Sequence, residues 1–270
     1  VGIELDESAI ARVRTVRDLL REAAASTEAG EEAEDLTKAL ETPEQLLEPE
    51  QKDALAEPGP VRRIIARVLL GLARLATRLL LRVEVRGRLP EDGPYLIAPR
   101  HLSALDPLVL LRALRTGQLD SLYWAGWTGL MFSGPLSRWF SRTARVLPID
   151  PGRAPRSSLA LAAAALDRGH ILVWFPEGRR SPDGTLQPFR PGIGPVLRAQ
   201  PVPVVPVWIE GTREAMPPGR LIPRPGRVRV IVGDPIPPDR FGRDERENVE
   251  TVHSALAALG DGRRAGEGAE

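Results

Sequence analysis

Two residues five positions apart, His101 and Asp106, could carry acid–base chemistry. His101 follows an apolar run that predicts a strand, and Asp106 comes directly before Pro107, a residue suited to the first position of a helix. The chain could turn here so that the carboxylate reaches the imidazole, leaving the other ring nitrogen free to remove a proton from a hydroxyl. The alternative is an ordinary Asp-Pro helix cap beside a surface histidine.

Residues 171–181, with the sequence ILVWFPEGRRS, combine a predicted strand with a charged turn. The strand is expected over Ile171–Phe175, and Arg179 and Arg180 follow the turn at Gly178. Open α/β sheets bind ligands at the carboxyl ends of their strands, and guanidinium groups suit phosphate. The pattern therefore predicts an anion site, unless the segment is only a Pro-Gly turn with solvated arginines.

Both segments follow predicted strands, so a sheet must bring them together. Short apolar runs alternate with helical stretches, which predicts an α/β fold with an open mixed sheet flanked by helices. The predicted strands are Leu81–Arg86, Tyr95–Ala98, Arg145–Ile149, Ile171–Phe175, Val202–Trp208 and Arg227–Val232. The predicted helices are Pro107–Arg115, Gly129–Ser141, Arg156–Asp167, Gly194–Ala199 and Arg246–Leu259.

The composition excludes several kinds of chemistry. The 270 residues include no cysteine and three histidines, which rules out disulfides, a thiolate nucleophile and Cys-ligated zinc. The chain also lacks a P-loop, a complete dinucleotide fingerprint and an H-E-x-x-H motif. We therefore expect no metal, no nucleotide cofactor and no nucleic-acid partner.

Charge divides the chain into unequal parts. Residues 27–58 carry eleven acidic groups against two lysines and few aromatic or β-branched residues, so we predict an acidic flexible linker over residues 27–60. The formal net charge of the whole chain is +1, which makes the remainder basic. One folded domain is predicted over residues 83–260, followed by a disordered tail over residues 261–270.

Residues 61–82, VRRIIARVLLGLARLATRLLLR, predict a basic amphipathic helix. Its aliphatic side chains fall opposite one arginine stripe, which contains Arg63, Arg67, Arg74, Arg78 and Arg82. Arginines are costly at a bilayer centre, so we predict that the helix lies in the headgroup plane of a membrane. The alternative is that the apolar stripe packs on the protein and the arginines are solvated.

Residues 1–26 resemble the last third of a phosphopantetheine acyl-carrier domain. The matching residues are Gly2, Glu4, Leu5, Thr15, Val16, Asp18 and Leu19. The resemblance implies a remnant of such a domain, without the serine that bears the cofactor arm. The alternative is a short amphipathic helix with Thr15 as its N-cap.

The H-x4-D spacing, followed roughly 70 residues later by F-P-E-G-x-R-S, resembles the glycerolipid acyltransferases typified by lysophosphatidic acid acyltransferase, over about residues 83–236. The resemblance implies that His101 is the general base and that Asp106 orients it. The implied phosphate-binding residues are Glu177, Gly178, Arg179, Arg180 and Ser181, with Arg153 from a second motif. Arg100 and Arg179 depart from the residues common in the family, which leaves the acceptor headgroup open.

The resemblance further implies an O-acyltransferase that moves a fatty acyl group from an acyl thioester to the hydroxyl of a lysophospholipid such as 1-acylglycerol 3-phosphate. The thioester, acyl-CoA or acyl-carrier protein, would be a co-substrate, and a carrier could act in cis. We expect a peripheral protein on the cytoplasmic face of a membrane. The alternatives are a thioesterase or lipid hydrolase that uses the same His–Asp pair, and a non-catalytic lipid- or carrier-docking module.

Aromatic residues concentrated between 121 and 140 could line an acyl tunnel, contact the membrane or form core.

Overall fold

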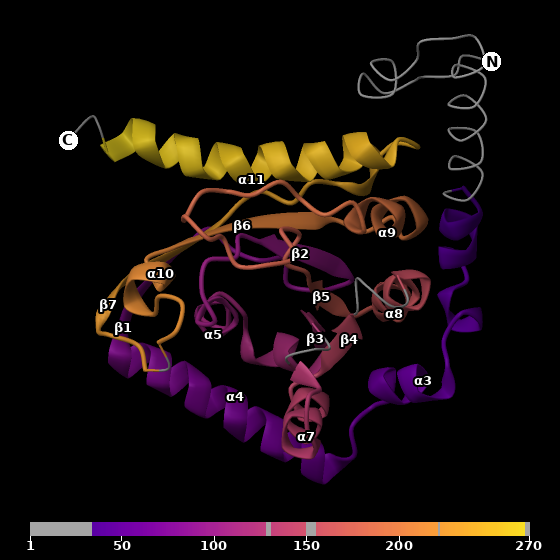
Figure 1. The fold of residues 1–270 in the computed structure, drawn as a ribbon, viewed down its shortest axis with the longest axis horizontal. Coiled ribbons are helices and arrows are strands. Elements are labelled where there is room, and N and C mark those ends of the chain that lie inside the picture. The colour runs from indigo at the N-terminus through magenta and orange to yellow at the C-terminus, as the bar shows by residue number, and fades with distance from the viewer. Residues whose placement is uncertain (1–33, 128–130, 150–154, 221, 268–270) are drawn as a thin grey trace.

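A mixed β-sheet forms the centre of the molecule (Figure 1). The computed structural model describes residues 34–127, 131–149, 155–220 and 222–267. Within these residues seven strands lie in the order β1-β7-β6-β2-β5-β3-β4. Their bounds are β1 Leu81–Arg86, β2 Tyr95–Pro99, β3 Leu122–Trp127, β4 Val146–Ile149, β5 Ile171–Val173, β6 Val204–Glu210 and β7 Gly226–Val232. Strands β6 and β7 pair antiparallel and all other neighbours pair parallel, which confirms the predicted fold class.

Helices cover both faces of the sheet. The α-helices are α3 Pro49–Leu55, α4 Pro60–Leu80, α5 Asp106–Leu110, α7 Pro135–Thr143, α8 Pro155–Asp167, α9 Ile193–Ala199, α10 Thr212–Ala215 and α11 Glu245–Glu267. The described part of the chain also forms three short 3-10 helices, η1 Pro43–Gln45, η2 Thr116–Asp120 and η3 Pro238–Arg240. In Figure 1, α11 crosses one side of the sheet and α4 runs along the opposite side.

Each strand contributes alternate side chains to two cores, because successive residues of a strand point to opposite faces. In β2, Leu96 and Ala98 enter the core formed with α8 and α9, whereas Tyr95 and Ile97 enter the core formed with α5. All five residues of β2 are buried, as is typical of a parallel strand covered on both faces. The loop that follows β2 is therefore anchored to the most buried part of the fold.

One strand was missing from the sequence prediction. Residues 122–127, LYWAGW, form β3, whose Trp124 pairs with Val146 of β4 and Val173 of β5. Tyr123 and Trp124 are buried in the two cores, so the interpretation of the aromatic region as core holds for these two residues. The predicted helix Gly129–Ser141 is observed as α7 from Pro135, and residues 128–130 lie outside the described residues.

The prediction of a flexible linker is wrong for its described part, residues 34–60. This segment forms a helix over residues 34–40, then η1 and α3. Leu40, Leu47 and Leu55 are buried in the core with α8. Acidic side chains dominated the composition, but three spaced leucines suffice to anchor the segment because each buries a large apolar side chain.

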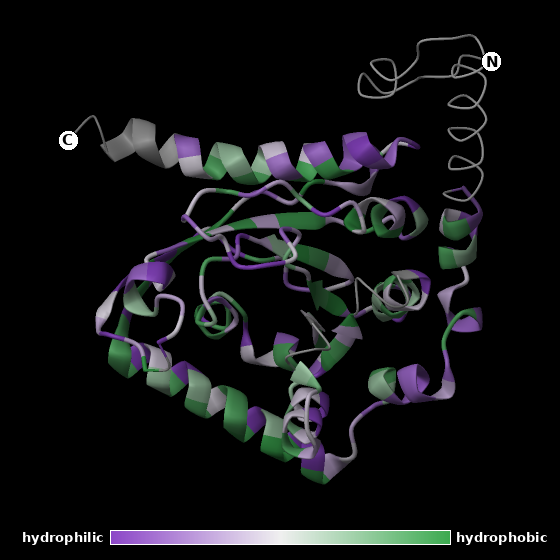
Figure 2. Cartoon of the chain, in the orientation of Figure 1, coloured by the Kyte–Doolittle hydropathy of each residue, from purple (hydrophilic) through white to green (hydrophobic). Residues whose placement is uncertain are grey.

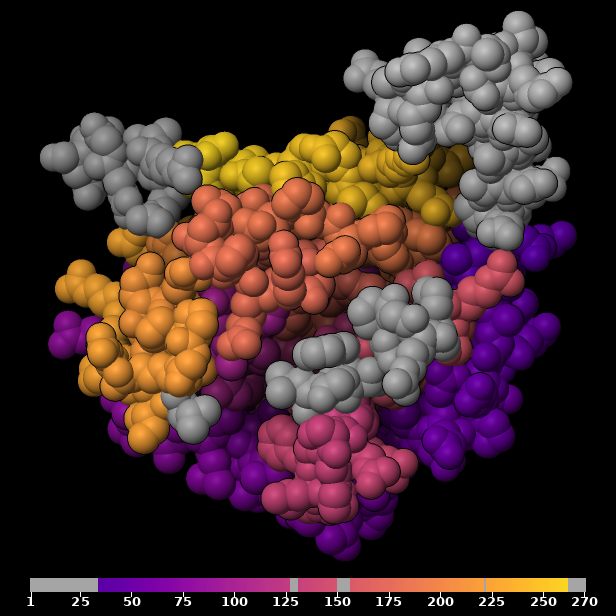
Figure 3. Space-filling model, viewed as in Figure 1, coloured from indigo at the N-terminus to yellow at the C-terminus, as the bar shows by residue number. Residues whose placement is uncertain are grey.

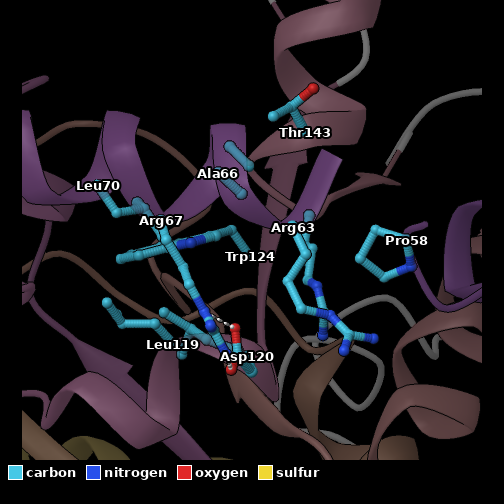
Figure 4. A pocket seen from close by; sticks show the side chains of 12 residues that line it. Pro58, Arg63, Ala66, Arg67, Leu70, Leu119, Asp120, Trp124 and Thr143 are labelled. Atoms are coloured by element: carbon cyan, nitrogen blue, oxygen red, sulfur yellow. Dashed lines mark hydrogen bonds and ion pairs between the residues drawn. The ribbon is translucent and has the colours of Figure 1, made fainter. Parts of the chain in front are cut away.

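Helix α4 turns Arg67 and Arg74 toward the protein and most of its large aliphatic side chains away from it. Nε of Arg67 donates to Oδ1 of Asp120 at 3.1 Å, beside Trp124 (Figure 4), and Nε of Arg74 donates to the carbonyl of Leu111 at 2.9 Å. The outward aliphatic residues are highly exposed: Val61 69%, Ile64 61%, Val68 54%, Leu72 56%, Leu75 51% and Leu79 75%. They give α4 the green outer segments of Figure 2. The alternative in which the apolar stripe packs on the protein is therefore wrong.

The ends of the chain differ from the prediction in one respect. Helix α11 continues to Glu267, so the predicted disordered tail over residues 261–270 is wrong as far as that residue. The predicted acyl-carrier remnant over residues 1–26 lies outside the described residues.

Candidate active site

Three connections meet at the carboxyl-terminal edge of β2, β5 and β6. His101 follows β2, Glu177 follows β5, and Thr212 begins α10 directly after β6. Because β2 pairs in parallel with both β5 and β6, the ends of these strands lie at one edge of the sheet. This is the edge at which open α/β sheets bind ligands, and the two predicted charged segments converge there.

The expected contact between His101 and Asp106 is present. Nδ1 of His101 lies 2.8 Å from Oδ2 of Asp106. A hydrogen bond to a carboxylate requires the proton on Nδ1, so Nε2 of the neutral ring is an acceptor. The imidazole lies against the ring of Phe175, with ring centroids 4.2 Å apart, and its side chain is 20% exposed. Nε2 has no hydrogen-bond partner among the described residues and can therefore receive a proton from a bound molecule.

Asp106 is completely buried and is held by several donors. The main-chain N–H groups of Leu102 and Ser103 donate to Oδ2 at 2.6 and 2.7 Å, and the Thr212 hydroxyl donates to Oδ1 at 2.6 Å. Pro107 follows at the start of α5, as predicted. A buried carboxylate with satisfied oxygens keeps one position, so Asp106 fixes both the tautomer and the orientation of the imidazole.

Glu177 joins the loop of His101 to the loop after β5. The His101 N–H donates to Oε1 at 2.6 Å, and the Gln187 N–H donates to Oε2 at 3.0 Å. Burial raises the pKa of Glu177, while the two N–H donors and the Arg100 charge act in the opposite direction. The side chain is buried and each oxygen accepts one main-chain N–H, so Glu177 holds the two loops together, and its implied contact with phosphate stays a prediction.

Gly178 and Ser181 shape the same loop. Gly178 has φ +68°, and a Cβ at this position would lie 2.8 Å from Cγ of Arg190, so the turn requires glycine. The buried Ser181 hydroxyl accepts from the Gly184 N–H at 2.9 Å and donates to the Thr185 carbonyl at 2.7 Å. Gly178 and Ser181 therefore set the conformation of the loop, and their implied contacts with phosphate stay predictions.

Arg179 and Arg180 are exposed between two residues fixed to His101. Glu177 accepts from the His101 N–H, and the Ser181 N–H donates to the His101 carbonyl at 2.8 Å. Neither arginine has a hydrogen bond or ion pair with the part of the chain that the structure describes. The loop that carries these two exposed guanidinium groups is therefore held to the backbone of His101. Arg153, the third predicted arginine, lies outside the described residues.

Arg100, which could have marked an altered headgroup site, has a structural role. Its guanidinium lies 4.1 Å from the centroid of the Trp208 ring and donates to the Gly184 carbonyl. Burial lowers its pKa, and nearby carboxylates including Glu177 oppose this effect. Arg100 therefore holds the loop that contains Gly184 against Trp208.

Thr212 was missed by the sequence analysis. It is placed by Gly211, which has φ +82° and whose added Cβ would lie 2.1 Å from the carbonyl oxygen of Arg227. Only glycine fits this close approach, and the chain turns there directly into α10. The Gly-Thr pair after an apolar strand was the available signal, but nothing in the sequence connects it to Asp106, 106 positions away.

The described residues hold neither a metal-binding cluster nor a membrane-spanning helix. No group of three or more metal-ligating His, Cys, Asp or Glu side chains occurs in these ranges. Among the same residues, no helix combines the length and apolar character needed to cross a bilayer.

Residues 81–210 match the family model described as Acyltransferase. This match agrees with the resemblance to the glycerolipid acyltransferases that the H-x4-D and F-P-E-G-x-R-S motifs carry. The acyltransferase match begins at β1 and ends with β6, so it includes the strands whose ends carry His101 and Glu177.

Curated relatives share parts of this domain. The chain is 36% identical over 149 residues to the chloroplast 1-acyl-sn-glycerol-3-phosphate acyltransferase BAT2 of Brassica napus, a match that covers 54% of this chain and 41% of that protein. It is 29% identical over 199 residues to 1-acyl-sn-glycerol-3-phosphate acyltransferase alpha of Ovis aries, covering 67% of this chain and 66% of that protein. The chain thus spans less than half the length of the Brassica protein.

A solved structure shares the fold of this acyltransferase domain. The crystal structure of the 1-acyl-sn-glycerophosphate acyltransferase PlsC from Thermotoga maritima matches with a TM-score of 0.61 and 24% sequence identity. The match covers 75% of this chain and 81% of that one. The architecture described above is therefore one that an acyltransferase adopts.

Proposed function

We propose that this protein transfers a fatty acyl group from an acyl thioester to the hydroxyl of a lysophospholipid such as 1-acylglycerol 3-phosphate. The observation that carries the proposal is the 2.8 Å contact between Nδ1 of His101 and Oδ2 of Asp106. The exposed Arg179 and Arg180 lie on the loop that is hydrogen-bonded to the backbone of His101. A general base next to cationic groups suits an acceptor that has both a hydroxyl and a phosphate. The acceptor named in the relatives has both groups.

His101 acts as the base in this proposal. Nε2 takes the proton of the acceptor hydroxyl as its oxygen attacks the thioester carbonyl carbon, and Asp106 stabilises the resulting imidazolium. When the tetrahedral intermediate collapses, the C–S bond breaks, and the leaving thiolate takes a proton from Nε2. The acceptor oxygen attacks the thioester directly, so no acyl-enzyme forms, and the proton passed to the thiolate returns His101 to its starting state.

The arginines bind the acceptor phosphate in this proposal. Arg179 and Arg180 lie on the loop whose ends are hydrogen-bonded to His101, so a phosphate held by them brings the attached hydroxyl toward the imidazole. Guanidinium groups offer paired N–H donors that match phosphate oxygens. Arg153 remains a proposed third contact.

Helix α4 places the enzyme on a membrane in this proposal. Its outward aliphatic residues form an apolar stripe, whereas Arg67 and Arg74 are bound to the protein. An exposed apolar helix face is costly in water and suits the boundary between headgroups and acyl chains. The protein would be peripheral on the cytoplasmic face of the membrane and take its acceptor from the bilayer surface.

The donor is acyl-CoA or an acyl-carrier protein in this proposal, and a carrier joined to residue 1 could act in cis. The segment that would tether such a carrier is docked on the core from residue 34 onward, which shortens its free length. Turnover with acyl-CoA, free acyl-carrier protein and a chain bearing an intact carrier domain tests this point. Equal use of all three would contradict delivery in cis.

A product assay tests the proposed reaction. The protein is incubated with labelled acyl-CoA or acyl-carrier protein and a panel of lysophospholipids, and lipids and free fatty acid are quantified. The expected product is a diacyl phospholipid that forms only when acceptor is present. Free fatty acid released at an undiminished rate without acceptor would identify a hydrolase, and vesicle binding without any product would identify a docking module.

A further inference from the structure

Helix α7 presents two arginines toward a hollow beside the start of α4. The hollow has a volume of about 240 Å³ and is lined by Arg62, Pro135, Arg138, Trp139 and Arg142. Helices α4 and α7 contact each other, and α7 projects beside α4 at the lower edge of the molecule in Figure 3. None of the residues proposed for catalysis or acceptor binding lines this hollow.

The arginines of the hollow form a positive cluster without a neutralising carboxylate. Arg138 and Arg142 are four residues apart on α7, so their side chains lie on the same face of the helix, and Arg62 comes from α4. None of these three side chains has an ion pair with a carboxylate in the described ranges. Like charges so placed repel one another, and an anion bound between them would remove this cost.

The hollow also has an apolar wall. Trp139, an exposed aromatic side chain of α7, and Pro135 lie in its lining. Tryptophan favours the boundary between headgroups and acyl chains, and arginine can extend from an apolar surface toward a polar headgroup. The surface therefore offers contacts for a phosphate and for acyl chains together.

We propose that this hollow binds the phosphate of an anionic phospholipid of the bilayer, at a site separate from the active site. The guanidinium groups of Arg62, Arg138 and Arg142 hold the phosphate, and the Trp139 ring in the lining lies at the boundary with the acyl chains. A free phosphate would use the arginines but leave the Trp139 ring in water. The inference rests on the membrane-surface part of the proposed function.

Vesicle flotation tests this site, with Arg→Lys variants that keep the net charge. The full chain is mixed with neutral phosphatidylcholine vesicles and with vesicles that also contain phosphatidylglycerol. Arg138→Lys/Arg142→Lys removes the planar guanidinium forks, and Arg243→Lys/Arg246→Lys is the control pair of exposed arginines away from α4 and α7. Thermal unfolding of each variant shows that the fold is retained.

The wild-type chain is expected to bind the anionic vesicles at least about tenfold more tightly than the neutral ones, the effect of about one hydrogen bond between a guanidinium and a charged group. Arg138→Lys/Arg142→Lys should lose most of this preference and bind neutral vesicles normally, whereas the control pair should behave as wild type. Unchanged binding of Arg138→Lys/Arg142→Lys, or an equal loss in the control pair, would overturn the inference.

Two further results distinguish an anionic-lipid site from general membrane docking and from a site for free phosphate. Equal binding of the wild type to both kinds of vesicle would overturn the lipid site and leave membrane docking intact. Inorganic phosphate that binds the wild-type chain and blocks its binding to anionic vesicles would assign the hollow to free phosphate and overturn the lipid assignment. The readout is binding, so a failure to detect acyl transfer would leave the result standing.

Discussion

The main-chain N–H of His101 donates to Oε1 of Glu177 at 2.6 Å and so joins two segments that are 76 positions apart. The Ser181 N–H returns a second bond to the His101 carbonyl. The loop that carries Arg179 and Arg180 is thereby held at both ends to the residue that carries the candidate base. The position of the arginine loop relative to His101 is therefore set by main-chain hydrogen bonds and by the buried carboxylate of Glu177.

Glu177→Gln should weaken this junction. An amide has one acceptor oxygen, so its NH2 group must face the N–H of either His101 or Gln187. Leaving a buried donor unsatisfied costs about 1–3 kcal/mol of unfolding free energy. Urea unfolding and steady-state kinetics check this, with the exposed Glu250→Gln as control. Wild-type stability and turnover in Glu177→Gln would show that the junction does not matter.

Arg180→Gln should act on acceptor binding. The change removes one guanidinium from the loop, so KM for lysophosphatidate should rise about tenfold or more, in line with a charged hydrogen bond. KM for an uncharged monoacylglycerol should not change. Arg179→Gln should act in the same direction, and the exposed Arg243→Gln serves as control. Equal effects on charged and uncharged acceptors would refute the phosphate role.

Acid should release the loop beyond Ser181. Hydrogen bonds from Thr185 and Ser181 lower the pKa of Asp183 to about 2, below its usual value of 3.8. Because the folded-state pKa is depressed, the contribution to stability is present above the unfolded pKa and is lost as pH falls from about 4 to about 2. Asp183→Asn should therefore be less stable than wild type at pH 7, and the gap should close near pH 2. A gap in melting temperature that stays constant over this range would contradict the assignment.

Leu72→Gln/Leu75→Gln should reduce binding to phosphatidylcholine vesicles. Both residues are exposed on α4, so melting temperature should change little, while the loss of two apolar contacts with the bilayer should weaken binding at least about tenfold. Ile222→Gln, which alters an exposed residue outside α4, is the matched control. Vesicle binding that survives in the double variant would place the membrane contact elsewhere.

Much of the sheet could be predicted from local sequence. Six strands were expected because their apolar runs end at Gly or Pro signals or at charged residues, and the His101–Asp106 contact followed from the Asp-Pro helix start. Strand β3 was not predicted because the sequence LYWAGW lacks a clear alternation of apolar and polar residues. The helices of the segment before α4 were not predicted because its acidic composition is typical of a flexible linker, although three of its leucines are buried.

Part of the site could also be predicted, because some of its contacts join residues close together in the sequence. The motif residues are local in sequence, whereas the Thr212 bond to Asp106 depends on how β6 lies beside β2. The sequence also could not show which residues of the charged turn are buried. Glu177 and Ser181 are buried and hold the loop, whereas the two arginines between them face solvent. The direction in which α4 faces likewise depends on the Asp120 and Leu111 partners of its arginines.

The most direct test of the account is the rate of labelled acyl transfer to lysophosphatidate by the wild type, His101→Ala, Asp106→Asn and Thr212→Val. Loss of the base or of its correct tautomer should lower kcat about a thousandfold or more, as removal of members of a comparable His–Asp system does. Thr212→Val should give a smaller loss in kcat with KM nearly unchanged, and Thr251→Val, on α11, should have no effect. Transfer at the wild-type rate by folded His101→Ala would contradict the account.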